Sequence, residues 1–189
     1  MKAFFFDLET TGLKFWKNGI HQMSGCIEVD GTVKETFNYK VAPNPAAEIE
    51  DEALKVGNVT REQILAYPPM KDIHGKLTDM LSKHCDKFDK TDKLFLIGYN
   101  NASFDNDFLR AFFKQCNDNY FGSWFWSSSI DVMVLASEAL KNKRHTMIDF
   151  KLKTVARELG IAVDEGKLHD AAYDIELTRQ IYHTLTDKK

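Results

Sequence analysis

The sequence predicts an α/β protein with a mixed β-sheet of three antiparallel and two parallel strands, flanked by α-helices. A short apolar run near the start precedes two strand-like segments that a tight turn joins, and later strand-like segments lead directly into helical ones. This order is typical of a mixed sheet with helices on its faces. No repeat, low-complexity tract or Ser/Gly-rich linker divides the chain. We therefore expect a single domain over residues 1–189.

The opening of the chain predicts the three antiparallel strands. The segment Ala3–Leu8 is apolar on both faces, as expected of a buried strand, and the turn residues Thr10, Thr11 and Gly12 end it. Two further strands are predicted at residues 20–29 and 33–41. Asp30 and Gly31 lie between them, and this pair favours a tight hairpin turn.

The remaining elements alternate between helices and two short strands. After Pro43 and Pro45, the spacing of apolar residues predicts helices at 46–56, 61–65 and 70–85. A strand at 94–98 leads into a helix at 104–115, for which Ser103 is the expected N-cap. A strand at 129–132 precedes a helical run that ends near Leu140, and the last helices are predicted at 150–159 and 170–185.

Composition and charge exclude several classes of protein. The net charge of −3 provides no general attraction to a polyanion, so a nucleic acid would have to bind at a local site, as in an enzyme rather than a coating protein. The three cysteines form neither a disulfide framework nor a zinc ribbon, and a reducing cytoplasm is the expected compartment. No signal peptide or membrane-spanning stretch is apparent, so no membrane association is expected.

Asp7 and Glu9 are the first candidates for chemistry. They are two residues apart on a predicted strand, so both side chains leave the same face where the strand gives way to a loop. Such a pair can hold one cation, although it can also simply solvate the end of a strand. The aromatic surroundings favour a functional role, because a carboxylate beside a dry core needs a metal or a donor to neutralise it.

Three more candidates lie at the starts of two later helices. Asp105 falls in the first turn of a helix that follows a strand, a usual location for ligand sites, although an acidic residue there also complements the helix dipole. His169 precedes the last helix and Asp174 lies one turn inside it, on the buried stripe. The nearby Asp107 fits a structural role. The other histidines show no ligand spacing: His21, His74, His84, His145 and His183.

Two further groups of side chains have both a functional and a structural interpretation. Lys141, Lys143 and Arg144 form a basic patch that can meet phosphates near a site or complement the end of a helix. An aromatic cluster is expected to form a satellite core under a loop, and it comprises Tyr120, Phe121, Trp124, Phe125 and Trp126.

Taken together, these residues resemble the motifs of the DEDDh family of 3′-to-5′ exonucleases, which has a ribonuclease H-like fold. FDLETTG resembles the first motif, NNASFDNDFL the second and HDAAYD the third. Connecting segments are also similar, namely ALKVGNVT, SIDVMVLA and KLKTVARELGI. Two positions depart from the pattern: Gln22 stands where the family often has glutamate, and Val132 where threonine often follows the aspartate.

The resemblance implies roles for the candidate residues. Asp7, Glu9, Asp105 and Asp174 would be the metal ligands and His169 the general base. Asp7, Glu9 and Asp174 would hold one ion, and Asp7 and Asp105 the second. Four carboxylates around a phosphodiester repel one another, so two divalent cations are required, and hard oxygen ligands suit Mg²⁺ or Mn²⁺.

The expected substrate is the 3′ end of single-stranded nucleic acid, most simply DNA, released as nucleoside 5′-monophosphates. Phe15 and Trp16 can stack on bases or serve as hydrophobic cover. The full set of expected substrate-binding residues adjoins the first two motifs and comprises Thr10, Thr11, Gly12, Leu13, Phe15, Trp16, Asn101 and Phe104. A polymerase or another nucleic-acid-processing protein is the expected kind of partner, and the oligomeric state is left open.

Two other functions stay open from the sequence. An RNA-trimming 3′–5′ exoribonuclease would use the same residues, because two-metal chemistry does not itself test for a 2′-hydroxyl. A non-catalytic nucleic-acid-binding module on the same fold is a different class of function, and the complete set of acidic residues argues against it.

Overall fold

A five-stranded mixed sheet forms the centre of the computed structural model, which describes residues 1–167 and 171–187. The strands are β1 (Lys2–Thr10), β2 (Ile20–Val29), β3 (Thr32–Lys40), β4 (Phe95–Gly98) and β5 (Ile130–Asp131). Their order in the sheet is β3-β2-β1-β4-β5. The first three strands pair antiparallel, whereas β4 and β5 run parallel to β1. The predicted mixed sheet is therefore confirmed.

The hairpin between β2 and β3 forms at the predicted turn. Asp30 has φ of 49° and Gly31 has φ of 78°, so both central residues are in the left-handed region. Turns of this kind match the twist of the flanking strands, and aspartate followed by glycine adopts them with little strain. The local sequence thus favours the turn that joins β2 to β3.

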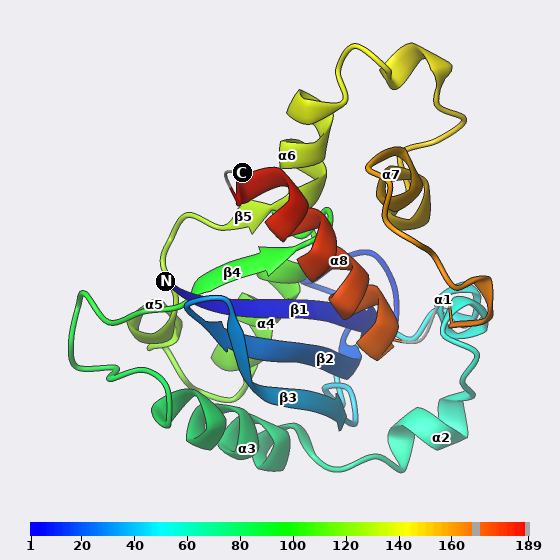
Figure 1. Cartoon of the computed structure of the whole chain (residues 1–189). Coiled ribbons are helices and arrows are strands. Elements are labelled where there is room, and N and C mark those ends of the chain that lie inside the picture. Colours follow the sequence, from blue (N-terminus) through cyan, green and yellow to red (C-terminus); the bar gives the residue numbers. More distant parts are fainter. Residues whose placement is uncertain (168–170, 188–189) are drawn as a thin grey trace.

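Helices cover both faces of the sheet (Figure 1). They are α1 (Asp51–Val56), α2 (Arg61–Leu65), α3 (Met70–Ser82), α4 (Asp105–Gln115), α5 (Phe121–Trp124), α6 (Val132–Ala139), α7 (Leu152–Glu158) and α8 (Ala171–Thr186). The helix predicted from residue 46 begins only at Asp51. Before it, the Asn44 side chain accepts a hydrogen bond from the Ala46 amide at 2.9 Å and forms a turn instead. None of the described helices is long and apolar enough to cross a bilayer.

One face of the sheet packs against α3, α4 and α5. Phe4, Phe6 and Leu8 of β1 point to this side and contact buried residues of these helices. The aromatic cluster near residue 120 belongs to this main core, so the expectation of a satellite core was wrong. The rings of Phe4 and Phe125 lie 5.4 Å apart because the short helix α5 brings the cluster under β1. Tyr120 is the exposed member of the cluster.

The other face packs against α6, α7 and α8 through a second cluster that includes Phe5 and Cys26. Glu28 of β2 is buried on this side and anchors α8. Its Oε2 accepts hydrogen bonds from Arg179 at 2.6 and 3.0 Å and lies 3.0 Å from His183 Nε2. The last helix is therefore held to the sheet by both apolar and ionic contacts. Cys26, Cys85 and Cys116 are free thiols, in agreement with the prediction of no disulfide framework.

His21 is buried on β2 with 1% of its surface exposed, and neither ring nitrogen has a hydrogen-bond partner in the described structure. Burial, with a smaller effect from the nearby charge of Lys40, lowers the pKa of His21 from 6.5 to about 4. Folding therefore requires the neutral ring. The stability that this neutral ring provides is complete above pH 6.5 and is lost as the pH falls toward 4.

We predict that His21→Leu makes the free energy of unfolding less sensitive to acid, because leucine has no proton to gain. Each pKa unit corresponds to about 1.4 kcal/mol, so between pH 7 and pH 5 the wild type should lose about 2 kcal/mol more than the variant. Urea unfolding at both pH values measures this difference. Other titrating groups are common to both proteins and cancel, so parallel pH curves would contradict the prediction.

Candidate active site

Asp7 and Glu9 extend from β1 at the carboxyl end of the strand, on the face covered by α8. They share this face with Phe5, whereas Phe4, Phe6 and Leu8 fill the opposite core. In the sheet, Asp7 lies opposite Ser24 and Glu9 opposite Gln22. The strand alternation therefore places both carboxylates on one side, as the spacing predicts.

Asp105 reaches the same end of β1 from the first turn of α4. Its Oδ1 accepts a hydrogen bond from the Leu8 amide at 3.2 Å, and only 5% of the residue is exposed. The expectation that Ser103 caps the helix was wrong: the cap position is Phe104, which makes no side-chain cap hydrogen bond. Asp105 is therefore hydrogen-bonded to β1. A residue that only complements the dipole of its own helix would not need this contact.

Asp131 shapes the loop before α4, and the sequence reasoning missed this role. Its carboxylate accepts hydrogen bonds from the amides of Asn100 at 3.0 Å and Ala102 at 3.2 Å. It also caps α6 by accepting from the Met133 amide at 2.9 Å. An aspartate directly before a helical run was a signal for the cap, but its contact with residues 100–102 depends on the parallel pairing of β4 and β5.

Asp174 lies in the first turn of α8 and is half-buried rather than fully buried. Its negative charge is close enough to Asp7 to raise the pKa of that carboxyl group. The adjoining His169 lies outside the described residues. Asp174 of the third motif thus lies near Asp7 of the first motif, at the carboxyl end of β1.

Burial and, to a smaller degree, mutual repulsion both destabilise the charged forms of these carboxylates. Burial, then the charges of Glu9 and Asp174, raise the pKa of Asp7 from 3.8 to about 7. Burial, then the charge of Asp7, raises the pKa of Asp105 well above its ordinary value, and the Leu8 amide opposes this shift only in part. Bringing these groups together as anions is unfavourable without a counter-charge.

The donor set fits hard divalent cations better than a closed structural metal site. Within the described residues, no three Asp, Glu, His or Cys side chains are arranged so that they could hold one ion by themselves. Magnesium is usually bound by one or two carboxylates, with water and substrate phosphate completing its coordination. The raised pKa values of Asp7 and Asp105 indicate a site in need of such positive charge.

The loop after β1 is held in shape by buried polar side chains. Thr11 is buried, and its hydroxyl donates to the Glu48 carbonyl at 2.7 Å and accepts from the Gly19 amide at 2.9 Å. Asn18, which the sequence reasoning missed, also donates to the Glu48 carbonyl, at 3.0 Å. A side chain at Gly12 would clash with Asn18, since a Cβ atom would lie 2.3 Å from Nδ2. Thr11 and Gly12 therefore have structural roles here.

Other residues of this loop are open to a ligand. Leu13 is 77% exposed and Trp16 is 70% exposed. The Trp16 ring meets Phe15 edge to face at 5.0 Å, and Phe15 packs against the core behind it. The Thr10 hydroxyl bonds to the Gly12 carbonyl at 2.7 Å and shapes the start of the loop. An exposed indole braced by a half-buried ring is suited to stacking on a base.

Asn101 and Phe104 lie in the loop between β4 and α4. Asn101 is fully buried, and its Nδ2 donates to Asn106 Oδ1 at 3.1 Å, whereas its Oδ1 has no partner among the described residues. Because the residue has no exposed surface, the expectation that Asn101 binds substrate directly is not supported, and its side chain holds the loop instead. Phe104 is half-buried against Phe108, with the ring centroids 4.9 Å apart.

A row of polar side chains continues from the acidic cluster across the same face of β2 and β3. Gln22 Nε2 donates to Asn38 Oδ1 at 2.9 Å, and Ser24 donates to the same oxygen at 3.2 Å. The Lys40 ammonium donates to the side-chain Oε1 of Gln22. Because only the register of three strands brings these residues together, no local motif signalled the row.

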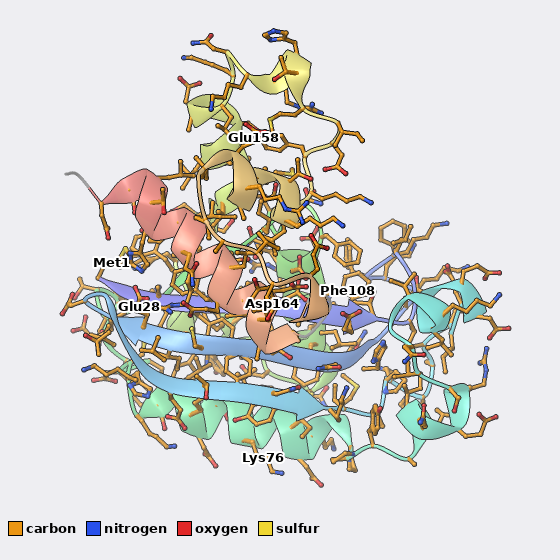
Figure 2. The ribbon with its side chains drawn as sticks, turned by 45° about the vertical axis from the view of Figure 1, so that its right-hand side comes forward. Met1, Glu28, Lys76, Phe108, Glu158 and Asp164 are labelled. Carbon is orange, nitrogen blue, oxygen red and sulfur yellow. The ribbon has the colours of Figure 1, made fainter. Side chains whose placement is uncertain are left out.

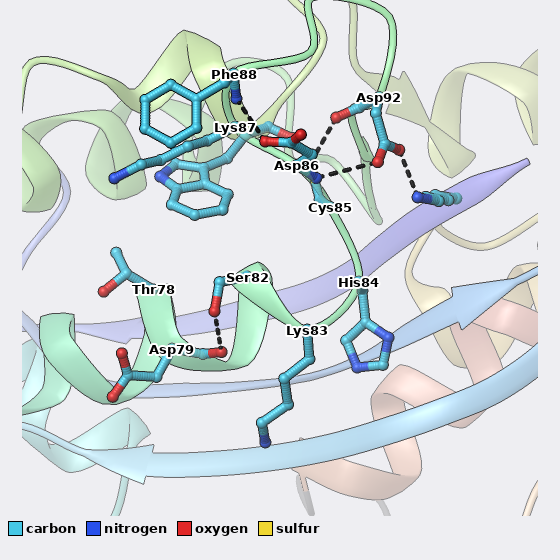
Figure 3. Close-up of a pocket in the computed structure, with 12 residues that line it drawn as sticks. Thr78, Asp79, Ser82, Lys83, His84, Cys85, Asp86, Lys87, Phe88 and Asp92 are labelled. Atoms are coloured by element: carbon cyan, nitrogen blue, oxygen red, sulfur yellow. Dashed lines mark hydrogen bonds and ion pairs between the residues drawn. The ribbon is translucent and has the colours of Figure 1, made fainter.

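A cavity of about 520 Å³ lies away from these carboxylates, beside Lys2 at the amino end of β1 (Figure 3). Several of its charged groups are ion-paired: Lys2 pairs with Asp92, and both Lys83 and His84 pair with Glu35. None of the four acidic residues of the motifs lines it. Three of the described histidines outside the motifs have acidic partners: His74 lies 3.0 Å from Asp118, His84 pairs with Glu35 and His183 with Glu28. His21 is buried without a hydrogen-bond partner in the described part of the chain, and His145 is exposed.

Comparison with known proteins identifies relatives over nearly the whole chain. Residues 4–182 match the family model RNase_T, described as Exonuclease. DNA polymerase III subunit epsilon of Pasteurella multocida is 26% identical over 95% of this chain. DNA polymerase III PolC-type of Mycoplasmopsis pulmonis is 24% identical over 94% of this chain. The chain spans 66% of the first relative's length and 11% of the second's.

Solved structures of exonuclease I share the fold. The apo form superimposes with a TM-score of 0.76 at 18% identity, covering the whole of this chain and 42% of that one. The E. coli enzyme in complex with a dT13 oligonucleotide gives a TM-score of 0.73 at 18% identity, with 96% of this chain and 40% of that chain covered. The ribonuclease H-like fold expected from the motifs is thus confirmed.

We predict that Asp7→Asn stabilises the metal-free protein at pH 8, because the amide removes the repelling charge. Because the pKa of Asp7 is raised from 3.8 to about 7, the folded protein favours the protonated carboxyl group. The stability associated with this group is complete below pH 3.8 and is lost as the pH rises through about 7. At about 1.4 kcal/mol per pKa unit, the gain should reach a few kcal/mol in EDTA and shrink toward pH 4. Thermal unfolding measures it.

Added Mg²⁺ should raise the melting temperature of the wild type and leave Asp7→Asn nearly unchanged. Asp107→Asn is the matched control, since it removes a charge two residues from Asp105 on the same helix. Equal responses of the two variants to EDTA and Mg²⁺ would argue against a charge-strained metal site at Asp7.

Proposed function

Because the chain belongs to the RNase_T exonuclease family, we propose that it is a metal-dependent 3′–5′ exonuclease acting on single-stranded nucleic acid, most simply DNA. The products would be nucleoside 5′-monophosphates. The observation that carries this proposal is the meeting of Asp7, Glu9, Asp105 and Asp174 at the carboxyl end of β1, with the pKa of Asp7 raised to about 7. A single exonuclease domain over residues 1–189 is part of the proposal.

The acidic residues would act as ligands. Asp7, Glu9 and Asp174 would contribute ligands to one ion, and Asp7 and Asp105 to the second. Water and substrate phosphate would complete each coordination shell, because no three of the described carboxylates surround one position by themselves. The oxygen donors suit Mg²⁺ or Mn²⁺. When bound, such ions supply activation of the attacking water and stabilisation of the leaving oxygen. Asp105 is already oriented for this task by the Leu8 amide.

His169 would accept the proton of the attacking water, since imidazole with an ordinary pKa of about 6.5 is a suitable base near neutral pH. The assignment rests on its place in the third motif, five residues before Asp174. The exposed Leu13 and Trp16 would contact the terminal nucleotides, whereas the buried Asn101 would support the loop before α4 rather than touch the substrate. Of the other expected contacts, Thr11 and Gly12 would support the loop after β1, while Thr10, Phe15 and Phe104 border the candidate site.

The choice of DNA follows from the names of the relatives, which are DNA polymerase III components, and of exonuclease I bound to dT13. Two-metal chemistry does not itself test for a 2′-hydroxyl, so RNA trimming is the second candidate. The same names make a polymerase or another nucleic-acid-processing protein the proposed kind of partner.

We predict that purified protein shortens 5′-labelled single-stranded DNA to a descending ladder in Mg²⁺, and that EDTA abolishes the reaction. A matched RNA oligomer distinguishes the two candidate substrates. Denaturing gel electrophoresis measures both polarity and preference. Binding of the oligomers without any cleavage in Mg²⁺ or Mn²⁺ would favour the non-catalytic binding module instead.

We predict that His169→Ala lowers kcat about 10² to 10⁴-fold, the usual contribution of a general base, with an unchanged melting temperature. Single-turnover digestion and thermal unfolding measure the two quantities. His84→Ala, whose ring pairs with Glu35 outside the motifs, is the control that should retain wild-type turnover. Full activity of His169→Ala would remove that residue from the mechanism.

A further inference from the structure

The segment between α6 and α7 projects away from the sheet (Figure 1). We call residues 141–151 the basic arm. Its charged residues are Lys141, Lys143, Arg144 and Lys151, with a single acid, Asp149. Every residue from 141 to 146 is exposed. A strongly positive surface of this kind is unexpected in a chain with net charge −3.

Internal contacts hold the basic arm in place. The Arg144 guanidinium lies 5.2 Å from the centroid of the Phe150 ring, and its Nη1 donates to the Met147 carbonyl at 3.4 Å. Met147 is itself buried in the cluster under α6, α7 and α8. The arm is therefore anchored at its middle and its end, and the Arg144 guanidinium has a preferred position.

The arm is also hydrogen-bonded to the chain just after β4, at the same end of the sheet as the carboxylates. The Tyr99 hydroxyl donates to the Phe150 carbonyl at 2.6 Å, and Tyr99 directly follows β4. The next residue, Asn100, is held by Asp131 in the loop that leads to Asp105. A short series of contacts thus connects Arg144 with the loop beside the acidic cluster.

The positive charges of the arm are only weakly compensated. Lys141 pairs with Glu138 on the surface, and Lys143 lies 3.9 Å from Glu158. No carboxylate of the described residues lies within ion-pair distance of Arg144. Exposed ion pairs of this kind contribute little and exchange readily for a stronger anion. Asp149 is occupied, since it accepts hydrogen bonds from the Lys151 amide at 3.1 Å and from Thr154 at 2.5 Å.

We propose that the basic arm binds phosphates of the nucleic acid strand upstream of the 3′ end, outside the residues that perform the chemistry. This inference rests on the proposed function and extends it to the path of the substrate. Arginine and lysine at fixed positions are suited to phosphate, and such contacts carry no sequence preference. The arm would let a long strand bind more tightly than a short one in a protein that otherwise repels polyanions.

The test compares two variants that remove equal charge. The arm variant is Lys141→Gln/Lys143→Gln/Arg144→Gln. The control is Lys71→Gln/Lys76→Gln/Lys90→Gln, whose exposed lysines lie on α3 and the loop after it, and Figure 2 shows Lys76 on the side opposite the arm. Fluorescence anisotropy in EDTA measures binding of single-stranded oligomers of about 20 and about 3 nucleotides at several salt concentrations. Each lost phosphate contact lowers the slope of log affinity against log salt by about 0.7.

The arm variant should bind the long oligomer about tenfold or more weakly at low salt, with a salt slope smaller by about 2. Its binding of the short oligomer, and the control's binding of both, should match the wild type. In Mg²⁺, KM for the long substrate should rise while kcat stays the same. Equal losses in both variants, or an equal loss for both oligomers, would overturn the proposal. Binding is measured without metal, so it tests the arm independently of catalysis. If the wild type binds the oligomers but does not hydrolyse them in Mg²⁺, the proposed function is refuted and the proposal for the arm is not.

Discussion

The hydrogen bond from the Leu8 amide to Asp105 joins two segments 97 residues apart at the point where the candidate chemistry would occur. It fixes the start of α4 against the carboxyl end of β1 and leaves Asp105 beside Asp7. The parallel pairing of β1 with β4 makes this contact geometrically available, because α4 follows β4 through a short loop. Asp131 then holds that loop, so the sheet, loop and helix form one rigid frame around the carboxylates.

The two apolar faces of the sheet supply the stability that such a frame requires. Phe4 and Phe6 pack on one side and Phe5 on the other, so β1 is buried almost to the residue at which its carboxylates begin. The change from phenylalanine to aspartate within a single strand is abrupt. Dry surroundings raise the proton affinity of Asp7 and Asp105, and the same surroundings would strengthen their attraction to a divalent cation.

Sequence patterns predicted the sheet well because its determinants are local. Strand alternation, the Asp30–Gly31 turn and the strand-to-helix order are each readable within a few residues. The cap of α4 was predicted wrongly because its loop is shaped by Asp131, from another strand.

The carboxylates of the candidate site were predicted from short motifs, but their supporting residues were not. Thr11 and Asn18 bond to Glu48, and Gln22 bonds to Asn38; neither set of contacts exists until strands and loops have met. Propensity and periodicity describe neighbours in sequence, so buried polar networks between distant segments stay invisible to them.

The outermost position of β3 has a consequence for how copies of the protein meet in solution. A strand with one unpaired edge can template pairing with another chain, which leads to aggregation. Lys34 and Lys40 carry positive charge along this strand, and an irregularity in its pairing with β2 falls between Ile27 and Glu28. Lysines on an edge strand disfavour pairing with another chain, so Lys34 and Lys40 protect the sheet from edge-to-edge association without contributing to its core.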